Sequence, residues 1–112
     1  MSKATAIPTA ARKAVRKRDH ERCGRCGSFN AHDIHHRMRR RDGGHALSNM
    51  VLLCRFDHEW VHANPAKARE HGFTVSAWGD VLDSPIKSFR GWIALDNEGG
   101  LFRVDVPPVV SA

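Results

Sequence analysis

All eight histidines and all three cysteines of this 112-residue chain lie between His20 and His71. A chain of this length has room for one domain, and its small core often needs a metal ion or a disulfide for stability. Disulfide bonds are a poor explanation for three cysteines, because their number is odd and residues 1–14 contain no apolar signal segment. We therefore expect these side chains to bind metal ions.

The length also excludes several large classes of protein. One domain over residues 1–112 leaves no room for a multidomain enzyme, a Rossmann nucleotide-binding fold or a TIM barrel. Because no window approaches 18 consecutive apolar residues, we expect no membrane span and a cytoplasmic location.

Positive charge is concentrated in the first third of the chain. Residues 1–41 contain twelve basic and three acidic side chains, a net charge of +9, whereas residues 42–112 have a net charge of −3. A basic half on a small protein favours a polyanionic partner, most often nucleic acid. The alternative is a solvated tail followed by a charged helix face.

The patterning predicts an α+β fold. We expect, in order, a basic helix over 8–18, a strand over 34–37, a loop over 38–48 and a buried strand over 50–54. A helix capped by Asp57 and a second helical stretch over 64–72 follow. The remainder, 73–106, is expected to form a small β appendage with strands over 73–75, 89–95 and 101–106 and a turn at 96–100. We expect Trp78 and Trp92 to pack inside this appendage.

The spacing of the histidines suits a shared metal ion, although an isolated pair of this spacing is more often two surface histidines on a helix. His58 and His62 are four residues apart, so on a helix both imidazoles project from one face. His35 and His36 are neighbours on a strand, so their side chains point to opposite faces. One of them can therefore bind the ion that His58 and His62 share, while the other is free to act as a base.

In this order and spacing, His35-His36, Asn49, His58 and His62 resemble the signature of the HNH endonucleases, whose active unit is a ββα-metal motif. The Cys23-x2-Cys26 knuckle and Cys54 resemble the zinc-stapled branch of that family, and small HNH proteins of tailed bacteriophages are similar. The resemblance implies a core motif over residues 23–62. It also implies a metal-dependent DNA endonuclease that leaves a 3′ hydroxyl, linked to phage genome processing or packaging, with packaging (terminase) proteins as partners.

The resemblance assigns a role to each matching residue. His36 matches the general base, and Asn49 matches the residue that ties down the loop and orients that base. His35, His58 and His62 match the ligands of a divalent active-site ion, which can be Mg, Mn, Ni or Zn. The basic side chains of the adjacent loop are expected to contact DNA phosphates; they are Arg37, Arg39, Arg40 and Arg41.

The chain departs from the family pattern at the structural zinc. Family members usually place a fourth cysteine three residues after the position of Cys54, where this chain has Asp57. Asp57 can complete a tetrahedral zinc site with Cys23, Cys26 and Cys54, since carboxylates also bind Zn²⁺. Alternatively, Asp57 is a helix N-cap, and the fourth ligand is water or one of three other histidines: His20, His32 or His45.

Two functions without catalysis remain open at this point. A zinc-knuckle DNA-binding protein would need the cysteines and arginines but not His36. A structural or adaptor subunit could have kept the fold and lost the activity. The presence of His36, Asn49 and His58 favours the enzyme.

Overall fold

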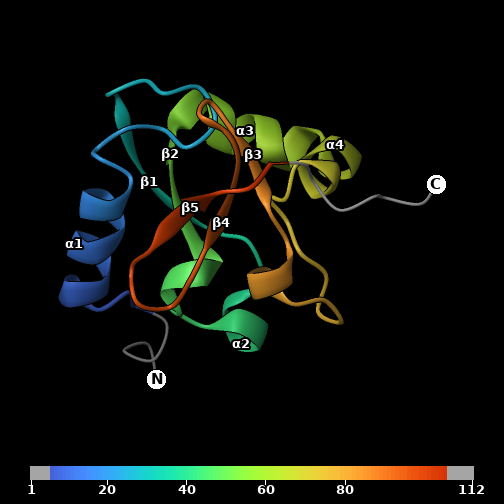
Figure 1. Ribbon diagram of the computed structural model, residues 1–112, viewed down its shortest axis with the longest axis horizontal. Helices are drawn as coiled ribbons and strands as arrows, with labels where there is room; N and C mark the ends of the chain where they lie inside the picture. The colour runs from blue at the N-terminus through green and yellow to red at the C-terminus, as the bar shows by residue number, and fades with distance from the viewer. Residues whose placement is uncertain (1–5, 106–112) are drawn as a thin grey trace.

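The computed structural model describes residues 6–105, which form short helices around two small antiparallel sheets (Figure 1). The helices are α1 (Thr9–Arg18), α2 (Arg40–Gly43), α3 (Arg55–Ala63) and α4 (Pro65–Glu70), with 3-10 turns η2 (Leu47–Asn49) and η3 (Val81–Asp83). The strands are β1 (Ala31–His36), β2 (Met50–Cys54), β3 (Ile86–Ser88), β4 (Gly91–Leu95) and β5 (Leu101–Arg103). The predicted α+β class is confirmed. No helix in the described part of the chain is long and apolar enough to cross a membrane.

The central unit is the hairpin of β1 and β2 with α3 packed against both strands. The two strands are antiparallel, and His36 at the end of β1 lies opposite Met50 at the start of β2. Every residue of β2 is buried, as its uninterrupted apolar sequence predicts. This ββα arrangement brings the histidines of β1 and α3 to the same side of the molecule.

Helix α1 is joined to β2 by a buried ion pair. The guanidinium of Arg18 donates to the Asp19 carboxylate at 2.8 Å and to the carbonyl oxygens of Leu47 (2.8 Å) and Met50 (2.6 Å). Asp19 in turn accepts the backbone N–H of Leu52 at 2.9 Å. Part of the basic excess of residues 1–41 therefore holds the fold together, and Arg18 is unavailable to a partner.

The C-terminal strands form a second sheet in the order β3-β4-β5. Ile86, Ile93 and Leu95 of this sheet are buried in the same hydrophobic cluster as Leu52 and Val61 of the ββα unit. Figure 1 shows the strands crossing in front of the hairpin. The C-terminal β segment, predicted to be an appendage, therefore shares the core of the ββα unit.

Several predicted boundaries are wrong. Residues 73–75 form no strand, whereas β3 was not predicted. The loop over 38–48 contains α2 and most of η2, and the expected strand over 89–95 begins only at Gly91. The last predicted strand ends at Arg103, and Val106 lies outside the described residues.

The start of α3 also differs from the prediction. The helix begins at Arg55, and its N-cap is Cys54, whose sulfur accepts the backbone N–H of Asp57 at 3.4 Å. The interpretation of Asp57 as the N-cap is therefore wrong. Its side chain, 1% exposed, is turned toward the cysteines.

Candidate active site and metal centres

Three imidazoles meet where β1 faces α3. One potential ligand atom each of His35, His58 and His62 lies within 4.8 Å of the other two, and we call these three residues the histidine triad. His58 and His62 share a face of α3 because they are four residues apart, and their ring centroids are 5.1 Å apart. Three imidazoles at this separation suit a borderline divalent ion and leave coordination positions for other ligands.

The ring of His35 is held in one orientation. Its Nε2 lies 2.6 Å from the carbonyl oxygen of Phe73. Because a carbonyl oxygen only accepts, Nε2 must carry the hydrogen, and Nδ1 keeps the lone pair. Burial lowers the pKa of His35 to about 4, so the ring is neutral near pH 7, the form that binds metal.

His58 is oriented by a carboxylate that the sequence interpretation missed. Oδ2 of Asp33 lies 3.0 Å from Nδ1 of His58, which leaves Nε2 of His58 for an ion. Asp33 also accepts from Arg55 at 2.8 Å, and this hydrogen bond lowers the pKa of the Asp33 carboxyl. The signal was available in the sequence, since Asp33 is two residues before His35 and shares its face of the strand.

His36 lies outside the triad, as expected for its place on the strand. Its Nε2 is 3.0 Å from Nδ1 of His45, a partner that sequence reasoning did not identify. Burial, with nearby Arg40 and then His45, lowers the pKa of His36 to about 4, so the ring is an unprotonated base near neutral pH. If Nε2 donates to His45, then Nδ1 is the basic atom.

Asn49 joins the two ends of the loop that follows β1. Its Oδ1 accepts the Met38 N–H at 2.7 Å, and its Nδ2 donates to the carbonyl oxygens of Met38 and Gly44, each at 3.0 Å. The backbone carbonyl of Asn49 accepts the N–H of Arg37 at 2.8 Å. Because this side chain is fully buried, these bonds fix the chain immediately after His36.

A second cluster lies at the other end of the hairpin. Ligand atoms of Cys23, Cys26, Cys54 and Asp57 all lie within 4.8 Å of one another, and we call them the cysteine cluster. The N–H groups of Arg25 and Cys26 face the Cys23 sulfur at 3.4 and 3.5 Å, which is the geometry of a metal-binding knuckle. Of the side chains considered for the fourth ligand position, the structure brings Asp57 to the sulfurs. His45 lies against His36 instead, and neither His20 nor His32 belongs to the cluster.

The two carboxylate oxygens of Asp57 have different neighbours. Oδ1 accepts from Arg25 at 2.6 Å, whereas Oδ2 lies 3.1 Å from the Cys23 sulfur and 3.5 Å from the Cys54 sulfur. Burial raises the pKa of Asp57, but hydrogen bonds from the cysteines and Arg25 more than offset it, so the net pKa is lowered. Burial also raises the pKa of Cys23 to about 12.

These properties fit a bound cation. Buried thiols form thiolates only when nearby positive charge offsets the desolvation. Three sulfurs and one carboxylate oxygen are a donor set for tetrahedral Zn²⁺. The cysteine cluster therefore suits a closed structural site, while the all-imidazole triad suits an ion with open positions.

The four arginines predicted to contact DNA do not share one environment. Arg37 is only 2% exposed, and its guanidinium donates to the carbonyl oxygens of Gly72 (2.8 Å), Ser48 (2.9 Å) and Ser84. The prediction that Arg37 contacts phosphates is therefore contradicted, because its donors hold the backbone. Three others, at or beside α2, are exposed; they are Arg39, Arg40 and Arg41.

Two surface hollows meet at the triad. One, of about 500 Å³, is lined by Asp33 and His58 and continues to Arg12 at α1. The other, of about 550 Å³, is lined by His35, His36 and four arginines; these are the buried Arg37 and the exposed Arg39, Arg41 and Arg69. His62 borders both hollows, so a polymer lying along them would cross the triad.

Comparison with known proteins agrees with this geometry. The family model described as HNH endonuclease matches residues 22–64, which include both metal clusters and His36. No curated protein and no solved structure matches the chain. HNH nucleases act on DNA and use divalent metal ions, and both clusters could hold one. Over residues 22–64 the chain is thus similar to the HNH endonucleases.

Proposed function

We propose that this protein is a DNA endonuclease that hydrolyses phosphodiester bonds with His36 as the general base. The proposal rests mainly on the position of His36 beside the histidine triad. His36 lines the same basic hollow as His35 and His62 of the triad. A DNA-binding protein without activity would use the cysteines and arginines but has no need of three imidazoles arranged for an ion.

The residues have separate roles in the proposed reaction. Nδ1 of His36 accepts a proton from the water that attacks phosphorus, while Nε2 is held by His45. Asn49 fixes the loop after His36 and so keeps the base in place. A divalent ion held by Nδ1 of His35, Nε2 of His58 and His62 would neutralise charge on the phosphate and assist the leaving oxygen.

Two further parts of the proposal, the structural zinc and the phage setting, are supported by different observations. The donor set of the cysteine cluster supports structural zinc, with Asp57 as the fourth ligand. The setting in phage genome processing or packaging, with terminase proteins as partners and a 3′ hydroxyl product, is supported by the sequence resemblance alone.

The proposal is tested by incubating purified protein with supercoiled plasmid. We expect conversion to open-circular or linear DNA when Mg²⁺, Mn²⁺, Ni²⁺ or Zn²⁺ is supplied, and none in excess EDTA. If none of the four ions supports plasmid cleavage, the proposal is contradicted.

Exposed arginines near α2 should contribute to DNA affinity. Replacing Arg39 and Arg41 by Ala removes two charges that line the hollow beside His36. For each phosphate that the variant no longer neutralises, the slope of log K against log salt should flatten by about 0.9 on duplex DNA. Filter binding or fluorescence anisotropy at several salt concentrations measures this slope.

The matched control removes the same charge elsewhere. Lys67 and Lys87 are exposed and line neither hollow, so their double replacement by Ala should leave the slope nearly unchanged. Equal flattening by both double variants would mean that net charge, and not this hollow, governs binding.

A further inference from the structure

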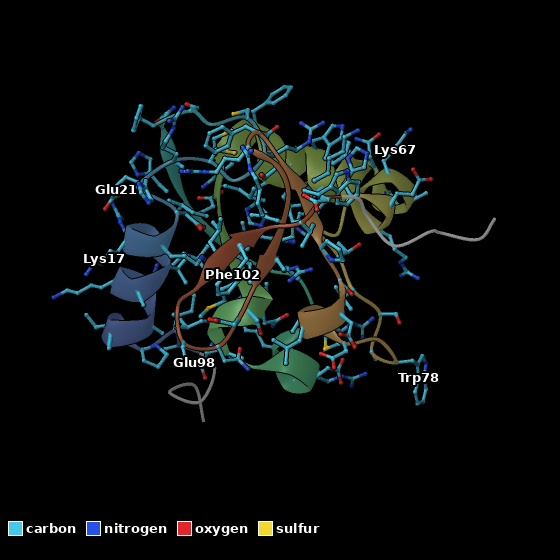
Figure 2. All side chains as sticks on the ribbon, viewed as in Figure 1. Lys17, Glu21, Lys67, Trp78, Glu98 and Phe102 are labelled. Carbon is cyan, nitrogen blue, oxygen red and sulfur yellow. The ribbon has the colours of Figure 1, made fainter. Side chains whose placement is uncertain are left out.

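The most exposed aromatic side chain of the described residues lies at the rim of the basic hollow. Trp78 is 97% exposed, although the sequence predicted that it packs inside the C-terminal β segment. Figure 2 shows Trp78 pointing away from the body of the protein. An isolated exposed apolar residue needs no explanation by itself. Trp78, however, lines the same hollow as His35 and His36.

The segment that carries Trp78 is tied to the strand that carries His36. Arg37 donates to the carbonyl oxygen of Gly72 on one side of this segment and to those of Val81 and Ser84 on the other. The carbonyl of Arg37 accepts the N–H of Val75 at 2.8 Å. The residue immediately after the proposed base therefore holds both ends of the segment 72–84.

The tip of the segment is a defined turn. The N–H of Gly79 donates to the carbonyl of Ser76 at 2.9 Å, and the N–H of Trp78 lies 3.3 Å from the Ser76 hydroxyl. At the base of the segment, Phe73 is fully buried. The structure thus presents a large flat ring to solvent at a fixed place relative to His36.

The charges of the side chains that line the hollow indicate which kind of molecule the Trp78 ring contacts. Its lining contains four arginines against one acidic side chain; the exposed ones are Arg39, Arg41 and Arg69, and the acid is Asp42. This lining suits a polyanion, and an aromatic ring beside it suits a nucleobase, because bases stack on indole faces whatever their identity. A protein partner with an apolar side chain would not account for the arginines.

From this arrangement we propose that Trp78 stacks on an unpaired base of the DNA strand bound in the hollow. In a duplex both faces of each internal base are covered by its neighbours, so an indole can stack only on a base that is unpaired or turned out. The inference rests on the proposed function and deepens it. The preferred substrate is DNA with a locally single-stranded region next to the cleaved bond.

The test measures binding and not cleavage, so it can fail independently of the nuclease proposal. Fluorescein-labelled DNA of one sequence, single-stranded or duplex, is titrated with full-length protein carrying His36→Ala, without added divalent ions. In this background we compare Trp78 with Trp78→Phe, Trp78→Ala and the control Phe102→Ala. Phe102 is 54% exposed on β5 and lines neither hollow.

We expect Trp78→Ala to weaken single-strand binding roughly 5- to 150-fold, with a much smaller loss on duplex DNA. Trp78→Phe should retain most of the affinity, and Phe102→Ala should not change it. Quenching of tryptophan fluorescence by the single strand should also be largely lost in Trp78→Ala. The proposal is overturned if Trp78→Ala binds single-stranded DNA with unchanged affinity, or if it loses equal affinity for both DNAs. It is also overturned if the wild-type protein forms a dimer that Trp78→Ala dissociates, because the ring would then contact a second copy of the chain.

Discussion

Replacing His36 by Ala should lower plasmid cleavage roughly 10²- to 10⁴-fold, because the variant lacks the group proposed to accept the proton from the attacking water. We expect the zinc content, thermal stability and DNA affinity of this variant to stay close to those of the wild type. His36 is outside both metal clusters, and its ring is bonded to His45 and not to the core. Initial rates at saturating metal and DNA, beside binding at equilibrium, measure the two effects separately.

Two comparison variants make this result specific. His20→Asn removes an exposed imidazole that belongs to neither metal cluster and lines neither hollow. Its backbone φ of 56° is one that Asn tolerates, so this variant should cleave normally. His58→Ala should lose activity through weaker metal binding, and high metal concentration should restore part of it. Wild-type cleavage by His36→Ala, or its recovery at high metal concentration, would remove His36 from the role of base.

The second large effect concerns the cysteine cluster. Cys23→Ser is expected to lose the structural zinc and to unfold or aggregate, because Cys23 is fully buried in a chain with little core to spare. Elemental analysis should find about one tightly bound zinc in the wild type and almost none in the variant. Circular dichroism follows the loss of fold.

Asp57 gives the finer test of the same site. Asp57→Ala should lose zinc and thermal stability together, because N-capping is performed by Cys54 and cannot explain such a loss. Asp57→Cys should keep the zinc, since it restores a four-thiolate donor set. Both variants remove the carboxylate that binds Arg25, so their difference reports metal binding and not the ion pair. A zinc content of Asp57→Ala equal to the wild type would exclude Asp57 as a ligand.

Local spacing was sufficient to predict the parts of the site that lie within one element. The separation of His58 and His62 places both on one face of α3, and the apolar run before Cys54 forms the buried strand β2. The knuckle at Cys23 and Cys26 is likewise a local structure. These features depend on interactions between residues close in the chain.

The incorrect or missing predictions depend on interactions between distant residues. Arg37 looked like part of a basic loop, but its partners are carbonyls at Ser48, Gly72, Val81 and Ser84, which no spacing rule connects. The bond from His45 to His36 similarly requires the loop that Asn49 closes. Trp78 was expected to pack inside the C-terminal β segment. The buried side chains of that segment are smaller apolar residues instead, including Ile86 and Ile93.

The most direct test of the account follows cleavage and bound zinc together while EDTA is added to the wild-type protein. The triad is open and the cysteine cluster is closed, so their ions should leave at different EDTA concentrations. We predict that cleavage stops while about one zinc per chain remains bound, and that added Mg²⁺ or Mn²⁺ restores cleavage. Cleavage that persists after the exchangeable metal has been removed, or that disappears only together with the tightly bound zinc, would contradict an active-site ion at the histidine triad.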